Sequence, residues 1–218
     1  SWDRLNGKTN YFGTIYNLPE EYKEVKESKD IRHELGISKE DIVVVSTGRI
    51  TKDKGYDVFW NVIQKTKSDK IKFIIAGDGA YRKEWGETII SKGYQNRVFL
   101  LGYRNDIDNI LSECDIFVTC TKHETLGNSV LEAAMHSLPV VATNTGGIPE
   151  IVGAEGGVLI ENGNVDEFAK AIQILADNVD LRMTMGNRLH QRVLKKFDRQ
   201  NILSRLDLLY QQVLYAKR

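Results

Sequence analysis

Two carboxylates in the middle of the chain have a spacing that suggests chemistry. Seven residues separate Glu124 from Glu132, and a turn-forming Gly127-Asn128 pair lies between them, followed by Ser129, a residue type that often begins a helix. A short apolar run at 114–119 precedes them and predicts a buried strand. The stretch therefore predicts a strand, a loop that carries Glu124, and a helix that carries Glu132 in its first turn.

This arrangement suits a ligand with phosphates in the middle and hydroxyls at both ends, such as a nucleotide sugar. Ligands of open α/β sheets bind outside the carboxyl ends of the strands, and the free N–H groups at a helix start attract anions. A second interpretation stays open from these residues alone. Ser129 and Glu132 also fit a capping box, in which Glu132 only accepts from the Ser129 N–H, and Glu124 is then a solvated loop residue.

Apolar, β-branched runs alternate with helical patterns along the chain. The predicted strands are 42–47, 71–76, 98–101, 114–119, 139–142 and 157–160, and the predicted helices are 56–67, 81–92, 165–177, 181–195 and 201–217. A charged stretch at 19–35 is expected to be partly helical. The alternation predicts an α/β fold with a single Rossmann-like, doubly wound parallel sheet and C-terminal helices. We assign 1–40 to a linker or leader from a preceding domain and 41–218 to the domain itself.

The loops after these strands should meet at one edge of the sheet. Arg49 and Lys54 follow the first strand, where two cations opposite a helix start can neutralise a diphosphate; two ordinary surface cations are the alternative. Asp106 follows the third strand and either holds a nucleobase edge or caps the next helix. Gly146 and Gly147 follow the fifth strand, where they would let the backbone approach a ligand closely.

Composition excludes several classes of protein. Thirty basic and thirty acidic residues cancel, so no overall field attracts nucleic acid or anionic lipid. Apolar runs all fall short of the roughly 20 residues that span a bilayer. The four histidines are scattered without metal-ligand spacing, so neither a metal nor a cofactor is expected. Cys114 and Cys120 flank a strand at a distance too long for a disulfide, which predicts a cytoplasmic protein.

A series of short motifs resembles a known family. In order, they are Gly48-Arg49-(x)4-Lys54-Gly55, Gly77-Asp78-Gly79, Phe99-Leu-Leu-Gly102, Glu124-(x)7-Glu132-Ala133, Pro139-Val-Val-Ala142 and Gly146-Gly147-(x)2-Glu150. The series is similar to the donor-binding, C-terminal half of the large retaining glycosyltransferase family with two Rossmann-like domains, the GT-B fold. The resemblance runs from about Asn17 to the C-terminus.

The resemblance implies roles for particular residues. It implies that Glu124 faces the donor sugar near the reacting carbon, as the catalytic residue, and that Glu132 binds the ribose. The full set of implied donor contacts is Arg49, Lys54, Leu126, Gly127, Asn128, Ser129 and Glu132, with Arg104 and Asp106 in the loop that borders the base. The family needs no metal ion, because cations and a helix dipole stabilise the leaving diphosphate.

The resemblance also implies the wider function. The expected enzyme moves a sugar, from a UDP-sugar rather than a GDP-sugar, to a glycan or lipid-linked acceptor in capsule, lipopolysaccharide or other polysaccharide synthesis. Its expected partners are the nucleotide sugar and an N-terminal acceptor-binding domain absent from this chain, with peripheral membrane association of the full-length enzyme. The alternatives are a nucleotide-sugar-binding module without transferase activity and an epimerase-like enzyme. An NAD-dependent oxidoreductase is disfavoured, because Arg82 stands where a dinucleotide fingerprint needs a third glycine.

Overall fold

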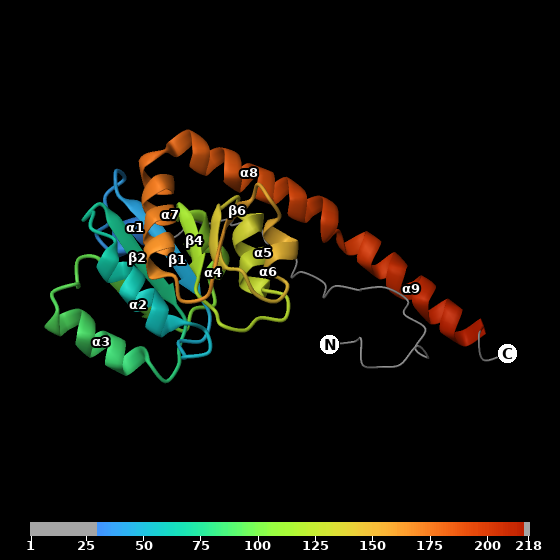
Figure 1. Cartoon of the computed structure of the whole chain (residues 1–218), viewed down its shortest axis with the longest axis horizontal. Coiled ribbons are helices and arrows are strands. Elements are labelled where there is room, and N and C mark those ends of the chain that lie inside the picture. Colours follow the sequence, from blue (N-terminus) through green and yellow to red (C-terminus); the bar gives the residue numbers. More distant parts are fainter. Residues whose placement is uncertain (1–29, 216–218) are drawn as a thin grey trace.

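A six-stranded parallel sheet forms the centre of the protein (Figure 1), in a computed structural model that describes residues 30–215. The strands are β1 (Ile42–Thr47), β2 (Ile71–Ala76), β3 (Val98–Gly102), β4 (Ile116–Thr119), β5 (Val140–Thr143) and β6 (Gly157–Ile160). Their order is β3-β2-β1-β4-β5-β6, and every neighbouring pair is parallel. This order confirms the predicted doubly wound, Rossmann-like sheet.

Helices cover both faces of the sheet. They are α1 (Ile31–Glu34), α2 (Tyr56–Lys65), α3 (Arg82–Ser91), α4 (Ile107–Ser112), α5 (Asn128–Met135), α6 (Ile148–Val152), α7 (Val165–Asp177), α8 (Val179–Lys196) and α9 (Arg199–Tyr215). Core residues of α2, α3 and α7 pack on one face, and those of α1, α4, α5, α6 and α8 pack on the other. The last helix, α9, extends away from the sheet (Figure 1).

The two-sided cover explains why the strands read as continuous apolar runs. Along β1, Val43 and Val45 belong to the core cluster on one face, and Val44 belongs to the cluster on the other. All three side chains are fully buried. A sheet that faced water on one side would instead show alternating polar residues. Burial on both faces also leaves the loops at the strand ends as the places where polar chemistry can occur.

Several predicted boundaries are wrong by a few residues. β4 begins at Ile116 rather than at Cys114, because the Cys114 N–H still donates to the Leu111 carbonyl at the end of α4. α8 begins at Val179 rather than at residue 181, because the Asn178 side chain caps it. The five-residue helix α6 is missing from the prediction, which has only a loop there.

The charged stretch at 19–35 lies mostly outside the described residues. Its described part contains the single turn of α1, which begins at Asp30, whose side chain accepts from the His33 N–H. Ile31 and Ile37 are buried in the core. Residues 31–37, which we placed in the linker, therefore pack on the sheet.

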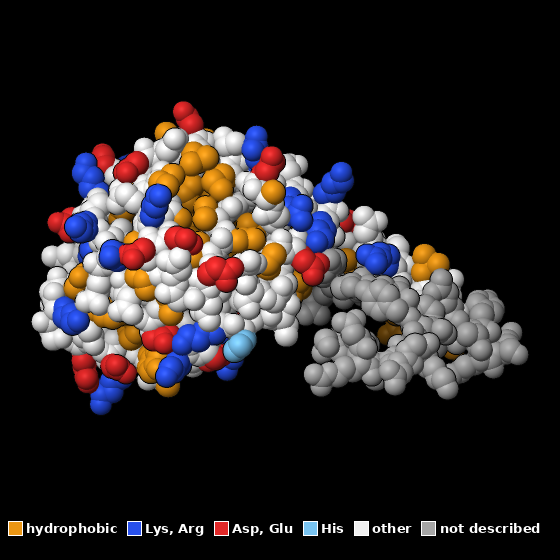
Figure 2. All heavy atoms as spheres, viewed as in Figure 1, with side chains coloured by type: hydrophobic (Ala, Val, Ile, Leu, Met, Phe, Trp, Pro, Cys, Tyr) orange, Lys and Arg blue, Asp and Glu red, His pale blue; other side chains and the backbone are white. Residues whose placement is uncertain are grey.

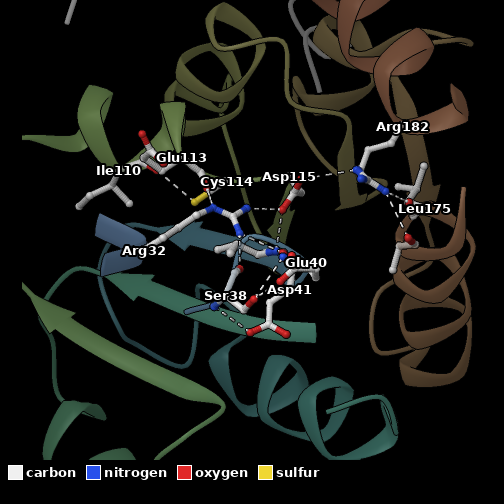
Figure 3. A network of polar contacts seen from close by, with 12 residues as sticks. Arg32, Ser38, Glu40, Asp41, Ile110, Glu113, Cys114, Asp115, Leu175 and Arg182 are labelled. Carbon is white, nitrogen blue, oxygen red and sulfur yellow. Dashed lines mark hydrogen bonds and ion pairs between the residues drawn. The ribbon is translucent and has the colours of Figure 1, made fainter. Parts of the chain in front are cut away.

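At the amino ends of the strands, Asp115 joins several elements (Figure 3). One oxygen accepts from the Arg32 guanidinium at 2.7 Å and from the Val43 N–H at 2.8 Å, and the other lies 3.7 Å from Arg182. Arg32 also donates to the carbonyls of Ser38, Asp41 and Glu113. One carboxylate thus ties α1, β1 and α8 to the start of β4.

The surface agrees with the balanced charge of the sequence. On the face seen in Figure 2, basic and acidic side chains are interspersed over the body of the domain. Some of the ion pairs join such exposed groups, as Lys65 and Asp166 do at 2.7 Å. Exposed pairs of this kind contribute little to stability, whereas the Asp115 network joins side chains that are mostly buried.

Replacing Asp115 by Ala should lower the free energy of unfolding by about 2–3 kcal/mol, because it leaves two guanidinium groups and the Val43 N–H without their carboxylate partner. Urea-induced unfolding measures this change. The matched control is Asp166→Ala, which removes an equally short but exposed ion pair and should cost less than about 0.5 kcal/mol. Equal costs for the two variants would contradict a special role for Asp115.

Candidate functional site

A cavity of about 600 Å³ opens at the carboxyl ends of the strands. Its walls come from the loops after β1, β2, β3 and β4 and from the first turns of α5. The chain runs from β1 outward in one direction and from β4 outward in the other, so the cavity lies at the topological switch point of the sheet. Crevices at this position are where doubly wound proteins bind ligands.

The cavity brings together most of the predicted site residues. Its wall includes Arg49, Lys54, Arg104, Glu124, Gly127, Asn128, Ser129 and Glu132. Leu126 and Asp106 are not part of the wall. The Leu126 side chain is buried in the core cluster instead, and the Asp106 carboxylate is turned toward Arg104.

The start of α5 differs from the prediction. Gly127 rather than Ser129 is the N-cap; its φ is 102°, and no side chain caps the helix. The Val130 and Leu131 N–H groups make the first bonds, to the Gly127 carbonyl, so the N–H groups before them are available to a ligand. The capping-box interpretation is therefore wrong, because it requires Ser129 at the cap. Glu132 lies in the second turn, not the first.

Glycines let the loop after β4 pack directly against its neighbours. A Cβ on Gly146 would lie 1.7 Å from the Glu124 carbonyl oxygen, and a Cβ on Gly55 would lie 1.7 Å from the carbonyl oxygen of Cys120. Gly146 and Gly147 were expected to admit a ligand. They admit the backbone of the Glu124 loop instead. The loop that carries Glu124 is thereby clamped between the loops after β1 and β5.

Lys54 and Glu124 form an ion pair inside the cavity. The Lys54 ammonium lies 2.8 Å from one oxygen of Glu124, and the other oxygen accepts the Thr125 N–H at 3.0 Å. Both side chains are mostly buried, with 26% and 17% exposed. The second cation, Arg49, is 74% exposed and lies 3.7 Å from Asp53. One cation is therefore held inside the cavity and the other at its mouth.

The loop after β3 is held by Arg104. Its guanidinium donates to both oxygens of Asp106 at 2.7 Å and to Glu34 on α1 at 3.2 Å. Hydrogen bonding to Asp106 raises the pKa of Arg104. Asp106 stands at the N-cap position of α4, yet its side chain makes no capping bond there. The N–H groups of Arg104 therefore hold this loop in place. Tyr103, which is 81% exposed, lines the cavity mouth.

Among the hydroxyl side chains that line the cavity, four lie in or directly after the strands and the next helix start, and the sequence prediction missed them. They are Ser46, Thr47, Tyr56 and Thr119. The Thr47 and Tyr56 hydroxyls are buried without a hydrogen-bond partner; Ser46 lies beside Tyr56, but the two do not form a bond of normal geometry. Burial raises the pKa of Tyr56 to about 12. A hydroxyl in an apolar strand gives no pattern that marks it as part of a site. Tyr103 lies in the loop from Gly102 to Asp106 that was expected to border the base, but it was not named as a site residue.

Metal and thiol chemistry find no support in the described part of the chain. Between residues 30 and 215, no group of three His, Cys, Asp or Glu side chains is placed to hold a metal ion. Cys114 and Cys120 are free thiols, which confirms that they form no disulfide. Burial raises the pKa of both thiols, so neither is a reactive thiolate.

Comparison with known proteins identifies the family. Residues 27–192 match the model of the family described as "Glycosyl transferases group 1". The chain belongs to this family. A lipopolysaccharide core biosynthesis glycosyltransferase, LpsE of Rhizobium meliloti, is 32% identical over 162 residues, which are 73% of this chain and 47% of LpsE. The N-acetyl-alpha-D-glucosaminyl L-malate synthase of Bacillus anthracis is 27% identical over 205 residues, 92% of this chain and 54% of that protein.

Solved structures agree with the fold. HepE of Anabaena, in complex with UDP, superposes with a TM-score of 0.77 at 25% identity and covers 84% of this chain and 51% of its own. The C-terminal domain of the group 1 protein LpcC from Francisella tularensis superposes with a TM-score of 0.69 at 23% identity over 79% of this chain and 93% of its own. This chain spans about half the length of the curated relatives it matches. Among residues 30–215, no helix is both long and apolar enough to cross a bilayer.

The clamp around the Glu124 loop predicts a specific stability defect. Gly146→Ala should lower the free energy of unfolding by more than the about 1–2 kcal/mol of left-handed backbone alone, because the new Cβ meets the Glu124 carbonyl. Gly163→Ala is the control, since Gly163 also has a positive φ, of 83°, but open space around it. Chemical unfolding of both variants measures the difference. Equal losses would show that the loops are not in tight contact.

Proposed function

We propose that this chain binds the donor of a retaining glycosyltransferase, and that the full protein moves a sugar from a nucleotide sugar to a glycan or lipid-linked acceptor. The destination that we propose is capsule, lipopolysaccharide or another polysaccharide. One observation carries the proposal. A single cavity at the switch point holds Lys54 and Arg49, an α5 N-terminus without a side-chain cap, and the carboxylates of Glu124 and Glu132.

Each of these groups suits one part of a nucleotide sugar. Lys54 and Arg49 would hold the diphosphate by charge-assisted hydrogen bonds, with the N–H groups of Asn128 and Ser129 contributing at the helix start. Glu132 would accept from the ribose hydroxyls, and Glu124 would face the sugar near its reacting carbon. Family membership and the carboxylate spacing support these roles.

The reaction needs groups that stabilise negative charge on the leaving diphosphate. When the bond between the sugar carbon and the phosphate oxygen breaks, the electron pair stays on the diphosphate. Lys54, Arg49 and the dipole of α5 would stabilise that charge as it develops. The Glu124 carboxylate would stabilise the positive charge on the sugar carbon. We propose that these fixed charges do the work without a metal ion and without a cofactor.

The mouth of the cavity suits the base. Tyr103 presents an exposed ring on which a base can stack, and Arg104 with Asp106 would fix that loop in place. We propose a UDP-sugar rather than a GDP-sugar. The relative HepE supports this choice, since it has been solved with UDP and with UDP-glucose.

Further elements of the proposal concern the rest of the protein. We propose that the acceptor binds to a separate N-terminal domain outside this chain, and that α9 crosses to it. We place the enzyme in the cytoplasm, with peripheral association of the full-length protein with the membrane and no nucleic-acid partner. The balanced charge of the chain supports the last point.

Calorimetry with UDP, GDP, ADP, NAD and the corresponding sugar conjugates tests the proposal. We expect UDP and a UDP-sugar to bind, NAD not to bind, and this chain alone to transfer no sugar. Binding of NAD in their place would favour an epimerase-like or oxidoreductase activity. Transfer by the full-length protein separates an enzyme from a module that only binds nucleotide sugars.

Replacing Lys54 by Ala should weaken nucleoside-diphosphate binding by about ten- to a hundredfold, since a charge-assisted bond is worth about 1.5–3 kcal/mol. Arg49→Ala should cost less, about three- to tenfold, because Arg49 lies exposed at the mouth, where solvent screens its charge. Lys65→Ala, which removes an exposed lysine outside the cavity, is the control and should leave affinity unchanged. Unchanged binding by Lys54→Ala with the fold intact would remove it from the site.

A further inference from the structure

In this structure the carboxylate of Glu124 pairs with Lys54, the cation that we assign to the phosphates. The ion pair is 2.8 Å long and mostly buried, and the Thr125 N–H holds the second oxygen of Glu124 at 3.0 Å. An anion that binds Lys54 must therefore either displace Glu124 or share the ammonium with it. Sharing brings two negative groups together in a partly buried site, which costs free energy.

The surrounding backbone leaves Glu124 little freedom except in its side chain. Gly146 packs on the Glu124 carbonyl, and a Cβ on Gly127 would lie 3.6 Å from the Glu124 Cγ. On the other side, the Lys122 N–H donates to the Asp53 carbonyl at 2.9 Å and fixes the loop of Lys54 against that of Glu124. The two loops cannot separate easily, so the exchange of partners has to occur by rotation of the two side chains.

We propose that the Lys54–Glu124 pair makes the site prefer the nucleotide sugar to the nucleoside diphosphate that remains after transfer. The inference rests on the proposed function and deepens it. When a diphosphate takes Lys54, Glu124 loses its cation. The hydroxyls of the donor sugar then supply hydrogen bonds to the carboxylate, whereas the nucleoside diphosphate has no sugar at that position. With the product alone, Glu124 competes for Lys54 and weakens binding of the diphosphate.

This arrangement follows from the location of the pair rather than from its strength. A second lysine–carboxylate pair, Lys122 and Asp57, lies nearby at 2.7 Å; its lysine is as buried as Lys54, and its carboxylate is more exposed than Glu124. Neither of its members lines the cavity. Only a pair that joins the phosphate end of the cavity to the sugar end can couple binding of the diphosphate to binding of the sugar. Asp57 therefore provides a matched control for Glu124.

The test measures the affinity of UDP and of UDP-glucose by calorimetry for the wild type and Glu124→Gln. We expect Glu124→Gln to bind UDP about three- to fivefold more tightly, because the ion pair that competes with the diphosphate is lost. The same variant should bind UDP-glucose more weakly. The preference for the sugar conjugate should fall by about tenfold or more. Asp57→Asn should change neither affinity.

A double variant separates exchange of partners from a general effect of charge. Removing any carboxylate near an anion site favours the anion, even without a direct ion pair. In the Lys54→Ala background, Glu124→Gln should no longer tighten UDP binding if Glu124 acts by competing for Lys54. A gain of the same size in both backgrounds would overturn the inference and leave only long-range electrostatics. Glu124→Ala, with thermal melts of every variant, guards against an effect of the new amide or of folding.

The outcomes for the function and for the inference are distinct. If the wild type binds none of the nucleotides or their sugar conjugates, the proposed function fails and the inference falls with it. If the wild type binds both ligands, but Glu124→Gln binds UDP equally or more weakly, the inference is wrong while the proposed function stands. Tighter UDP and weaker UDP-glucose binding, limited to chains that contain Lys54, support the inference.

Discussion

The site depends on direct contact between loop backbones at the switch point of the sheet. At Gly55 and Gly146, the neighbouring carbonyl lies where a Cβ would be, so no other residue fits without moving a loop. These contacts set the distance between the loops after β1, β4 and β5. The polar side chains have their positions because of them, since Lys54 and Glu124 project from loops that cannot drift apart. Packing of the backbone thus determines where the charged side chains of this cavity lie.

At the amino ends of the strands, ion pairs rather than backbone contacts hold the neighbouring elements together. There Asp115 joins α1, which carries the chain into the sheet, to α8, which carries it out toward α9. The guanidinium of Arg32 satisfies three backbone carbonyls at the same place. A partly buried charge is stable only when its hydrogen bonds are satisfied, and here they are. α1 and the first turn of α8 are therefore tied to the sheet, although neither lines the cavity.

Sequence patterns predict this fold well, because both faces of the sheet are covered and the strands stand out as apolar runs. The bounds of β1, β2 and β6 follow from such runs directly. Helix α6 is too short to show a period, and it was missed for that reason. The pairing of Lys54 with Glu124 joins residues 70 positions apart; both were predicted to belong to the site, but only the three-dimensional structure shows that they neutralise each other. The buried hydroxyl of Tyr56 gave no signal at all, since an aromatic residue at a helix start is ordinary core.

The helices differ in how their first turns are capped. α1, α7 and α8 begin with Asp or Asn side chains that accept a backbone N–H. α2, α3, α4, α5 and α6, which follow β1 to β5 in turn, have no such bond from the cap residue. A side-chain cap is worth about 1 kcal/mol, so its absence from five consecutive helices is a cost to the folded state. At α5, a serine or aspartate cap would occupy N–H groups that a phosphate can use. Gly127 leaves them open, and its left-handed backbone turns the chain into the helix without a Cβ close to Ile148. The same residue therefore gives up stability and leaves the start of α5 open toward the cavity.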